Sequence, residues 1–297
     1  MIFINYYDEI KNELVNNEIT KKVKDYSKNR SDLTTYYNVG KLLSEAGKHY
    51  GEGIIKEYSK RLTNEFGTKF GITLLKRIRQ FYIVIEKGAT MSHQLSWSHY
   101  CELLPVNSID KINYYIKITK EQNLSVRELR KRIKNNDYER LDEETKKKLK
   151  DKEKLKLPDL VKNPLQIRNT SGNNEISEKI LQKLILEDIP SFLDELGNGF
   201  TFVRNEYKIK IGDRYNYIDL LLFNYEFNCF VVVELKVTEL KKEHIGQIEF
   251  YMNYIDKNLK NINQNKTIGI IICKKENRYV IEYCSDDRII SREYELV

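Results

Sequence analysis

Three charged residues interrupt two otherwise apolar runs in the C-terminal half of this 297-residue chain. Asp219 lies in the run 217–223, whereas Glu234 and Lys236 lie in the run 230–237. Side chains two positions apart on a strand point to the same face, so Glu234 and Lys236 share a face. Burying a carboxylate or an ammonium group is costly unless the group is paired or bound to a metal. The three charges therefore indicate a site that does chemistry.

The register of the two runs predicts that Asp219 and Glu234 are cross-strand neighbours. If Glu226 and Phe227 form a two-residue hairpin turn, position 219 faces position 234. Cβ atoms at paired positions lie roughly 4.5–5.5 Å apart, so the two carboxylates repel each other. A hard divalent cation relieves that repulsion, and we expect Mg²⁺, which Mn²⁺ can replace. The alternative is an ion pair between Lys236 and one of the carboxylates, which leaves the other carboxylate unexplained.

Hydrophobic periodicity predicts the elements that position these residues. A helix with a bend at Pro190, ended by Gly197 as a left-handed cap, opens the second half. The order of elements predicts an α/β sandwich with a mixed central sheet. The expected elements are a helix over 176–196, strands over 202–211, 215–223 and 229–237, a helix over 242–259, and strands over 267–273 and 279–283.

The N-terminal half has a different pattern, because its apolar positions recur at helical spacing from Tyr6 to about Tyr138. We expect a helical domain over 1–141 that binds DNA or a partner protein. Residues 142–174 are rich in charged residues and end in a turn-rich stretch, which predicts a solvated linker. The α/β domain then covers 175–297.

One part of the helical domain resembles a helix-turn-helix. Residues 58–66, a turn at Gly67 and residues 73–82 form this pair, and the second helix carries the candidate nucleic-acid-binding residues Lys76, Arg77 and Arg79. Helix pairs joined by a glycine turn are common, so an ordinary packing role is the alternative. For Trp97 and His99 we expect a helix start and core packing, and for the basic stretch 127–134 a solvated helix face.

The distribution of charge favours the N-terminal half as the part that contacts a polyanion. The chain has 51 Lys and Arg against 44 Asp and Glu, a net charge of +7. Residues 1–157 carry 32 basic and 22 acidic side chains, net +10, and residues 158–297 carry 19 and 22, net −3. A part of a chain with such an excess of basic residues typically attracts nucleic acid. The bland alternative is a lysine-rich composition that reflects an AT-rich genome.

Several classes of protein are not expected. No run of about 18 apolar residues is present, and the N-terminus lacks the pattern of a signal peptide, so we expect a cytoplasmic protein with no membrane partner. The four cysteines and four histidines are scattered, which argues against a zinc site or a disulfide framework.

The spacing Asp219…Glu234-x-Lys236 resembles the PD-(D/E)xK nuclease superfamily, with Ile218 in place of the first Pro of the motif. Gln247 and Tyr251 add a Q-x-x-x-Y pattern on the following helix, which resembles RecB-like members. Positions i and i+4 lie on one face of a helix.

At family level, the chain resembles the YhcG-type nucleases, which join a helical N-terminal domain to a C-terminal nuclease domain. Such proteins often carry a Glu about ten residues before the segment 192–197, where this chain has Gln182. Glu178, one turn earlier, is a candidate to take the place of that Glu. The matching segments, in order, are 79–82, 95–99, 192–197, 199–203, 233–236 and 269–274.

This resemblance implies a metal-dependent nuclease that hydrolyses DNA phosphodiester bonds in repair, recombination or defence against foreign DNA. The metal ligands would be Asp219, Glu234 and the carbonyl of Leu235, and Lys236 would act on the attacking water or the phosphorane. Gln247 and Tyr251 would position the substrate backbone or a water, with helix-surface packing as the alternative. The competing hypothesis is a non-catalytic DNA-binding or assembly protein with an impaired site. A homo-oligomer or a partner protein remains open.

Overall fold

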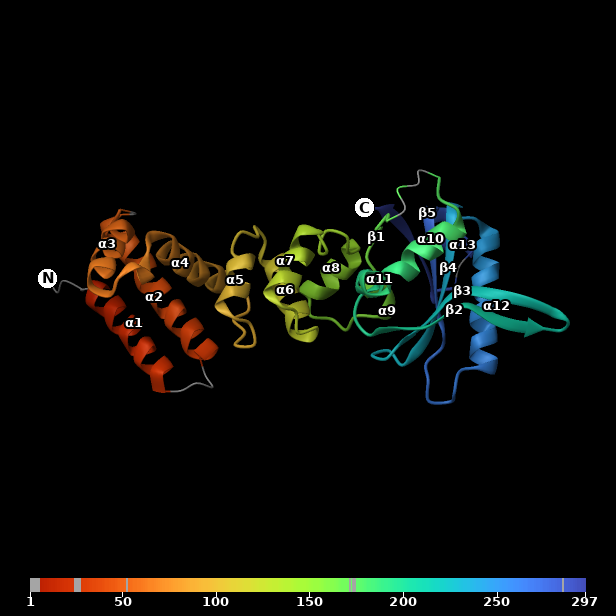
Figure 1. Cartoon of the computed structure of the whole chain (residues 1–297), viewed down its shortest axis with the longest axis horizontal. Coiled ribbons are helices and arrows are strands. Elements are labelled where there is room, and N and C mark those ends of the chain that lie inside the picture. The colour runs from red at the N-terminus through yellow and green to blue at the C-terminus, as the bar shows by residue number, and fades with distance from the viewer. Residues whose placement is uncertain (1–5, 24–27, 52, 171, 173–174, 285) are drawn as a thin grey trace. The chain divides into compact units, whose positions relative to one another are not determined.

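A computed structural model describes the whole chain except residues 1–5, 24–27, 52, 171, 173–174 and 285. The chain folds into two compact units, Met1–Tyr138 and Glu139–Val297 (Figure 1). The first five residues, on which the signal-peptide expectation depends, lie outside the described part. Within it, no helix has the length and apolar character needed to cross a membrane.

The first unit is helical, as the periodicity predicts. Its helices bury two apolar clusters, one around Leu43 and Leu62 and the other around Phe81 and Tyr115. The elements are α1 (Tyr6–Val23), α2 (Lys28–Tyr50), α3 (Ile54–Phe66), the short 3-10 helix η1 (Thr68–Phe70), α4 (Ile72–Glu86), α5 (Trp97–Leu103), α6 (Ile109–Glu121) and α7 (Val126–Lys134).

Helices α2 and α4 pack with their backbones close together. A Cβ atom at Gly40 of α2 would lie 2.5 Å from the carbonyl oxygen of Ile78 in α4. A larger side chain at Gly40 would therefore force the two helices apart, which explains why glycine stands at this helical position.

The start of α5 has the structural role predicted for Trp97 and His99. Ser96 caps the helix, and its backbone N–H donates to Nδ1 of His99 at 3.0 Å. Nε2 of the same ring lies 3.0 Å from the carbonyl oxygen of Leu124. Trp97 packs against Tyr36, with ring centroids 4.6 Å apart. Both ring nitrogens of His99 are therefore occupied by backbone contacts within the unit.

The second unit is built on a six-stranded sheet with the order β1-β6-β5-β4-β3-β2 (Figure 1). Strands β2, β3 and β4 are antiparallel, whereas β4, β5, β6 and β1 are parallel, so the sheet is mixed as predicted. The elements are α8 (Glu143–Lys150), α9 (Leu157–Leu160), β1 (Leu165–Ile167), α10 (Glu178–Glu187), α11 (Ile189–Leu196), β2 (Phe200–Ile211), β3 (Arg214–Asn224), β4 (Cys229–Glu239), α12 (Lys242–Asn258), β5 (Ile268–Lys275), α13 (Arg278–Cys284) and β6 (Ile289–Leu296).

Helices cover both faces of this sheet. Leu184 of α10 and Phe192 of α11 belong to one apolar cluster, together with Val233 of β4. Met252 of α12 belongs to the other cluster, together with Val232 of β4. Because Val232 and Val233 point to opposite faces, β4 is a central strand covered on both sides, as its apolar sequence predicts.

Two elements differ from the prediction. Residues 279–283, predicted as a strand from their aromatic and β-branched side chains, lie in helix α13. Asn277 precedes this helix and its side-chain oxygen accepts from the backbone N–H of Val280, which favours a helix start. The single bent helix over 176–196 is two helices, because Asp188 ends α10 and caps α11 through the N–H of Ser191. Gly197 ends α11 with a positive φ of 110°.

The segment 142–174 is not the solvated linker that its charge predicts. It contains α8, α9 and β1, and it belongs to the second unit. Leu157, Val161, Leu165 and Ile167 are buried in the core, and β1 pairs in parallel with β6. These four apolar residues follow the lysine-rich stretch and anchor the segment to the core. Residues 171 and 173–174 of the predicted linker lie outside the described part.

A buried carboxylate of α11 holds this segment in place. Glu195 accepts hydrogen bonds from Arg140 and from the backbone N–H of Gln166, and Lys162 Nζ lies 3.4 Å from Glu195 Oε1. Burial raises the pKa of Glu195, but the hydrogen bond from Arg140 and the charge of Lys162 outweigh it and lower the pKa. Glu195 lies in the segment 192–197, and its role there is structural.

Candidate active site

The register of β3 and β4 matches the prediction. Five pairs, from Asn224↔Cys229 to Leu220↔Val233, follow the predicted register. The turn between the strands spans 225–228, longer than the expected two residues. Continuing the ladder by one position places Asp219 opposite Glu234.

Asp219 and Glu234 are neighbours at the site, Glu234 buried and Asp219 half-buried. Oδ2 of Asp219 accepts the backbone N–H of Leu235 at 2.8 Å. Glu234 is 1% exposed, and its Oε1 is buried without a hydrogen-bond partner among the described residues. Burial, followed by the charge of Asp219, raises the pKa of Glu234 to about 8. Burial also raises the pKa of Asp219. Burial and mutual repulsion therefore disfavour the ionised form of both carboxyl groups, and a bound cation would stabilise that form.

Lys236 lies beside the two carboxylates, on the same strand as Glu234. Its Nζ is 3.4 Å from Oε2 of Glu234 and 3.8 Å from Oε2 of Glu178. The alternative ion pair with Glu234 is thus present in this structure. It does not satisfy Oε1 of Glu234, and burial still outweighs it in setting the pKa of that carboxyl. The positive charge of Lys236 alone therefore does not compensate the two carboxylates.

Helix α10 contributes two side chains to the site. Gln182, which stands where family members often carry Glu, donates from Nε2 to the backbone carbonyl of Asp219 at 3.1 Å. Gln182 therefore supports the strand instead of supplying a carboxylate. Glu178, one turn earlier, reaches Lys236 and brings a negative charge near Asp219.

Helix α12 contributes to the site from the face of the sheet opposite the one that α10 and α11 cover. Nε2 of Gln247 donates to the hydroxyl of Tyr251 at 3.2 Å, so the predicted i, i+4 pair forms. Tyr251 is buried; burial raises its pKa, and the charges of Glu234 and Asp219 raise it further. The tyrosine hydroxyl is therefore close enough to respond to both carboxylates. The roles of Gln247 and Tyr251 in catalysis stay predictions.

Two residues near the site were not expected. Burial and then the charge of Lys236 lower the pKa of His244, near the start of α12. Glu206 of β2 adds a negative charge that raises the pKa of Asp219 beyond the effect of burial, and its own φ is 44°. A two-residue turn at 212–213 sets a register in which position 206 faces position 219. The Gly212-Asp213 turn in the sequence is therefore the signal that points to Glu206.

The chemistry of the donor set suits a hard divalent cation. Asp219 and Glu234 offer oxygen atoms only, and one of these oxygens is buried without a partner among the described residues. In the part of the chain that the structure describes, no group of three or more His, Cys, Asp or Glu side chains is arranged to hold a metal. Further ligands would have to be backbone carbonyls, water or substrate, so the carbonyl of Leu235 stays a prediction.

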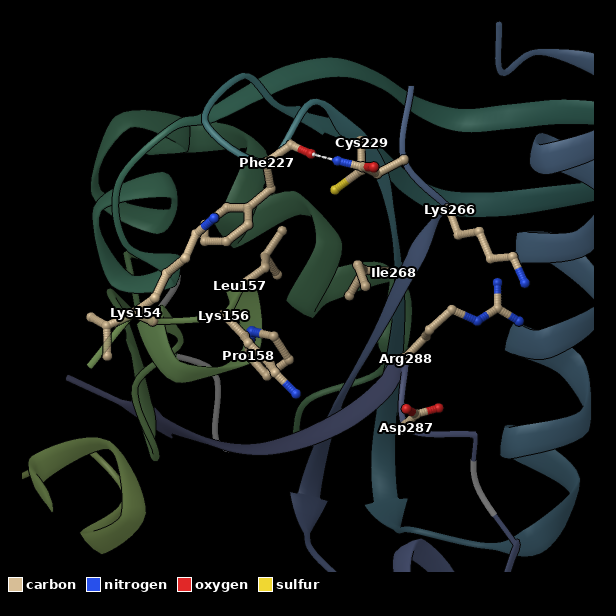
Figure 2. Close-up of a pocket in the computed structure, with 12 residues that line it drawn as sticks. Lys154, Lys156, Leu157, Pro158, Phe227, Cys229, Lys266, Ile268, Asp287 and Arg288 are labelled. Carbon is tan, nitrogen blue, oxygen red and sulfur yellow. Dashed lines mark hydrogen bonds between the residues drawn. The ribbon is translucent and has the colours of Figure 1, made fainter. Parts of the chain in front are cut away.

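A separate cavity of about 530 Å³ lies elsewhere in the second unit (Figure 2). Leu157 and Pro158 line it together with Phe227 and Ile268, and Lys154 and Lys266 are among its polar lining residues. Figure 2 shows the backbone oxygen of Phe227 hydrogen-bonded to an adjacent amide, which is the side chain of Asn265 at 2.7 Å. None of the candidate site residues lines this cavity, so it is distinct from the carboxylate pair.

The predicted nucleic-acid-binding residues of the first unit lie on α4, after the turn formed by Gly67 and η1. Lys76 and Arg77 are exposed. The guanidinium group of Arg79 lies 3.6–3.7 Å from the position that a Cβ on Gly47 would occupy, so Arg79 packs against α2. Nucleic-acid contact by Lys76 and Arg77 stays a prediction, and Arg79 has a packing role in addition.

Two family models match the chain. Residues 158–296 match the YhcG PDDEXK nuclease domain, and residues 9–140 match the DUF1016 N-terminal domain. The second unit is a YhcG-type PDDEXK nuclease domain. The family resemblance predicted from the sequence is confirmed.

A curated relative of this YhcG-type chain spans both units. The chain is 26% identical over 330 residues to the "Putative nuclease YhcG" of Escherichia coli, covering 95% of this chain and 88% of that protein. The helical unit and the nuclease domain therefore occur together in this relative.

The YhcG-type chain also has similarity to solved structures. A repair endonuclease from Pyrococcus abyssi is 18% identical, with a TM-score of 0.29 over 43% of this chain and 49% of that chain. The EndoMS–dsDNA2 complex is also 18% identical, with a TM-score of 0.29 over 43% of this chain and 48% of that chain. The chain spans about half the length of these solved structures.

Proposed function

We propose that the chain is a divalent-metal-dependent nuclease that hydrolyses phosphodiester bonds in DNA. The observation that carries this proposal is the buried Glu234 beside Asp219, with one carboxylate oxygen unsatisfied and Lys236 next to it. Packing alone gives no reason to keep two carboxylates at one end of an apolar sheet. A phosphodiester substrate and a cation together supply the missing charge balance.

Asp219, Glu234 and the carbonyl of Leu235 are the groups that would hold the cation, which we expect to be Mg²⁺ or, in its place, Mn²⁺. A bound divalent cation polarises the scissile phosphate and lowers the pKa of a coordinated water. The hydrogen bond from the N–H of Leu235 holds the Asp219 carboxylate in place before any ligand arrives. This preorganisation reduces the rearrangement that binding requires.

Lys236 places its positive charge beside Glu234, where it orients the attacking water or stabilises negative charge on the phosphorane. Gln247 and Tyr251 position the substrate backbone or a water from α12. In this proposal Glu178 competes with the substrate phosphate for Lys236, since it lies 3.8 Å from the ammonium group in the structure.

The helical unit serves as the DNA- or partner-binding domain, through Lys76 and Arg77 on α4. The activity belongs to DNA repair, recombination or defence against foreign DNA in the cytoplasm, and the protein acts alone, as a homo-oligomer or with a partner protein. Gln182 favours a second candidate, a DNA-binding or assembly protein without catalysis, because it leaves the helix position without a carboxylate.

A substrate panel separates the two candidates. Purified full-length protein is incubated with labelled single-stranded, duplex and branched DNA and with RNA, each with Mg²⁺, Mn²⁺ or EDTA. The proposal predicts cleavage of DNA with a divalent metal and none with EDTA. DNA binding without cleavage under every metal condition would favour the non-catalytic candidate.

A further inference from the structure

The hairpin of β2 and β3 continues beyond the candidate active site as a two-stranded arm. Figure 1 shows the arm running past α12 and ending away from the rest of the sheet. The register pairs Lys208 with Tyr217 and Lys210 with Tyr215. Directly opposite residues on paired strands share a face, so these four side chains form one face of the arm, here called the Lys/Tyr face.

The Lys/Tyr face is exposed, whereas the other face of the arm is packed. Tyr215 is 52% exposed and Tyr217 is 51% exposed. Ile209 and Ile218, which point the opposite way, are fully buried in the cluster that includes residues of α12. Burial of one face holds the arm in a fixed orientation, so exposure of large aromatic rings on the other face is not a result of disorder.

The charges on this face have no acidic partners. Lys208 Nζ lies 3.8 Å from the centroid of the Tyr215 ring, and Lys210 Nζ lies 5.9 Å from the same centroid. Neither lysine forms an ion pair with a residue that the structure describes. The face therefore combines positive charge with aromatic rings, and that combination typically binds single-stranded nucleic acid.

The Lys/Tyr face adjoins the metal site along β3. Tyr215 and Tyr217 precede Asp219 on the same strand. Ile218 belongs to the cluster on the α12 side and Leu220 to the cluster on the other side, so the strand changes the facing of its side chains at Asp219. With a rise of about 3.4 Å per residue, Tyr217 lies about 7 Å and Tyr215 about 14 Å along the strand from Asp219. A strand of nucleic acid held on this face would arrive at the carboxylate pair.

We propose that the arm binds unpaired nucleotides of the strand that is cut, with bases stacked on Tyr215 and Tyr217 and phosphates contacted by Lys208 and Lys210. This inference rests on the proposed nuclease function and names its substrate class. Unpaired nucleotides fit better than a duplex, because the base faces that tyrosine rings need are covered by neighbouring bases in a duplex.

The test measures binding of full-length protein in EDTA by fluorescence anisotropy, with a single-stranded oligonucleotide and its duplex. Stacking contributes about 1–3 kcal/mol per base, so Tyr215→Ala with Tyr217→Ala, which removes two stacking rings, is expected to weaken single-strand binding by about 30-fold or more. Duplex binding is expected to change by less than about two-fold. The control is Tyr279→Ala with Tyr283→Ala, since these tyrosines of α13 are 73% and 75% exposed and lie off the arm.

The lysines are tested through the salt dependence of binding. Each phosphate contact on a single strand contributes about 0.7 to the slope of log K against log salt, so Lys208→Ala with Lys210→Ala is expected to reduce the slope by about 1.4. Lys147→Ala with Lys150→Ala is the matched control, because both lysines are exposed on α8. Thermal melts verify that every variant is folded.

The outcomes for the arm and for the nuclease activity are separate. Unchanged single-strand binding by the Tyr215 and Tyr217 variant, or an equal loss in the α13 control, overturns the arm proposal even if the wild type cuts DNA. A wild type that binds single strands through the arm but cuts nothing under any metal condition contradicts the proposed function and leaves the arm proposal standing.

Discussion

The backbone N–H of Leu235 donates a 2.8 Å hydrogen bond to Oδ2 of Asp219, a carboxylate sixteen positions earlier on the neighbouring strand. This bond replaces the ladder contact where the β3–β4 pairing ends after Leu220↔Val233. Asp219 is thus fixed next to Glu234 by the backbone of the same strand that carries Glu234. The position of the Asp219 carboxylate is therefore set by the backbone of β4.

Replacing Lys236 separates its catalytic and structural interpretations. Because Lys236 lies beside the carboxylates and the expected position of the phosphate, Lys236→Ala should reduce the cleavage rate by about 10²-fold or more. Metal affinity and DNA affinity should stay nearly unchanged. Lys242→Ala, which removes an exposed lysine at the start of α12, is the control and should cleave normally.

The ion-pair interpretation predicts a different result for the same variant. Removing the ammonium group that lies beside the buried Glu234 carboxylate would lower the free energy of unfolding by about 3–5 kcal/mol. A thermal melt of Lys236→Ala measures this. A large drop in Tm, in a protein that never cleaves under any metal condition, would leave Lys236 as a structural residue.

Glu234 makes the stability of the metal-free protein depend on pH. Its pKa is about 8 in the folded chain against 4.5 for the ordinary carboxyl, so between these values the folded state holds a proton that the unfolded state has lost. The free energy of unfolding should therefore fall as the pH rises from about 5 to about 8, by about 1.4 kcal/mol for each unit of pKa difference at most. Urea denaturation in EDTA should show a steeper fall for the wild type than for Glu234→Gln. Parallel curves would contradict the raised pKa.

The first unit should bind DNA through charge. Residues Met1–Tyr138 carry 24 basic and 16 acidic side chains, net +8, and have their own buried clusters. A fragment of these residues should bind duplex DNA with a clear salt dependence, and Lys76→Ala with Arg77→Ala should reduce the slope by about 1.8. Arg127→Ala with Lys131→Ala on α7 is the control. A fragment that does not bind DNA would identify the helical unit as a partner-protein module.

The strands and the register of the site could be predicted because their signals are local. The run 229–237 is apolar on both faces, and a short turn fixes its pairing with the run before it. Charges inside such runs then stand out against the packing. Four expected strands match β2, β3, β4 and β5 to within three residues at each end.

The remaining parts could not be predicted because their determinants are distant in the sequence. The segment 142–174 is ordered by partners such as Glu195 and strand β6, which no local pattern links to it. Helix α13 depends on the cap at Asn277, whereas its side chains favour a strand. Glu206 differs from these, because the local turn at Gly212 and Asp213 places it opposite Asp219 by the same register rule that pairs Asp219 with Glu234.

The most direct measurement of the central claim is calorimetric titration of Mn²⁺ or Mg²⁺ into the wild type, Asp219→Ala and Asp213→Ala. The last variant is the matched control, because it removes an exposed carboxylate from the tip of the same hairpin. If Asp219 and Glu234 hold the metal, the wild type and Asp213→Ala should bind it alike, and Asp219→Ala should lose most of the affinity. Equal metal binding by all three proteins would contradict the assignment of the site.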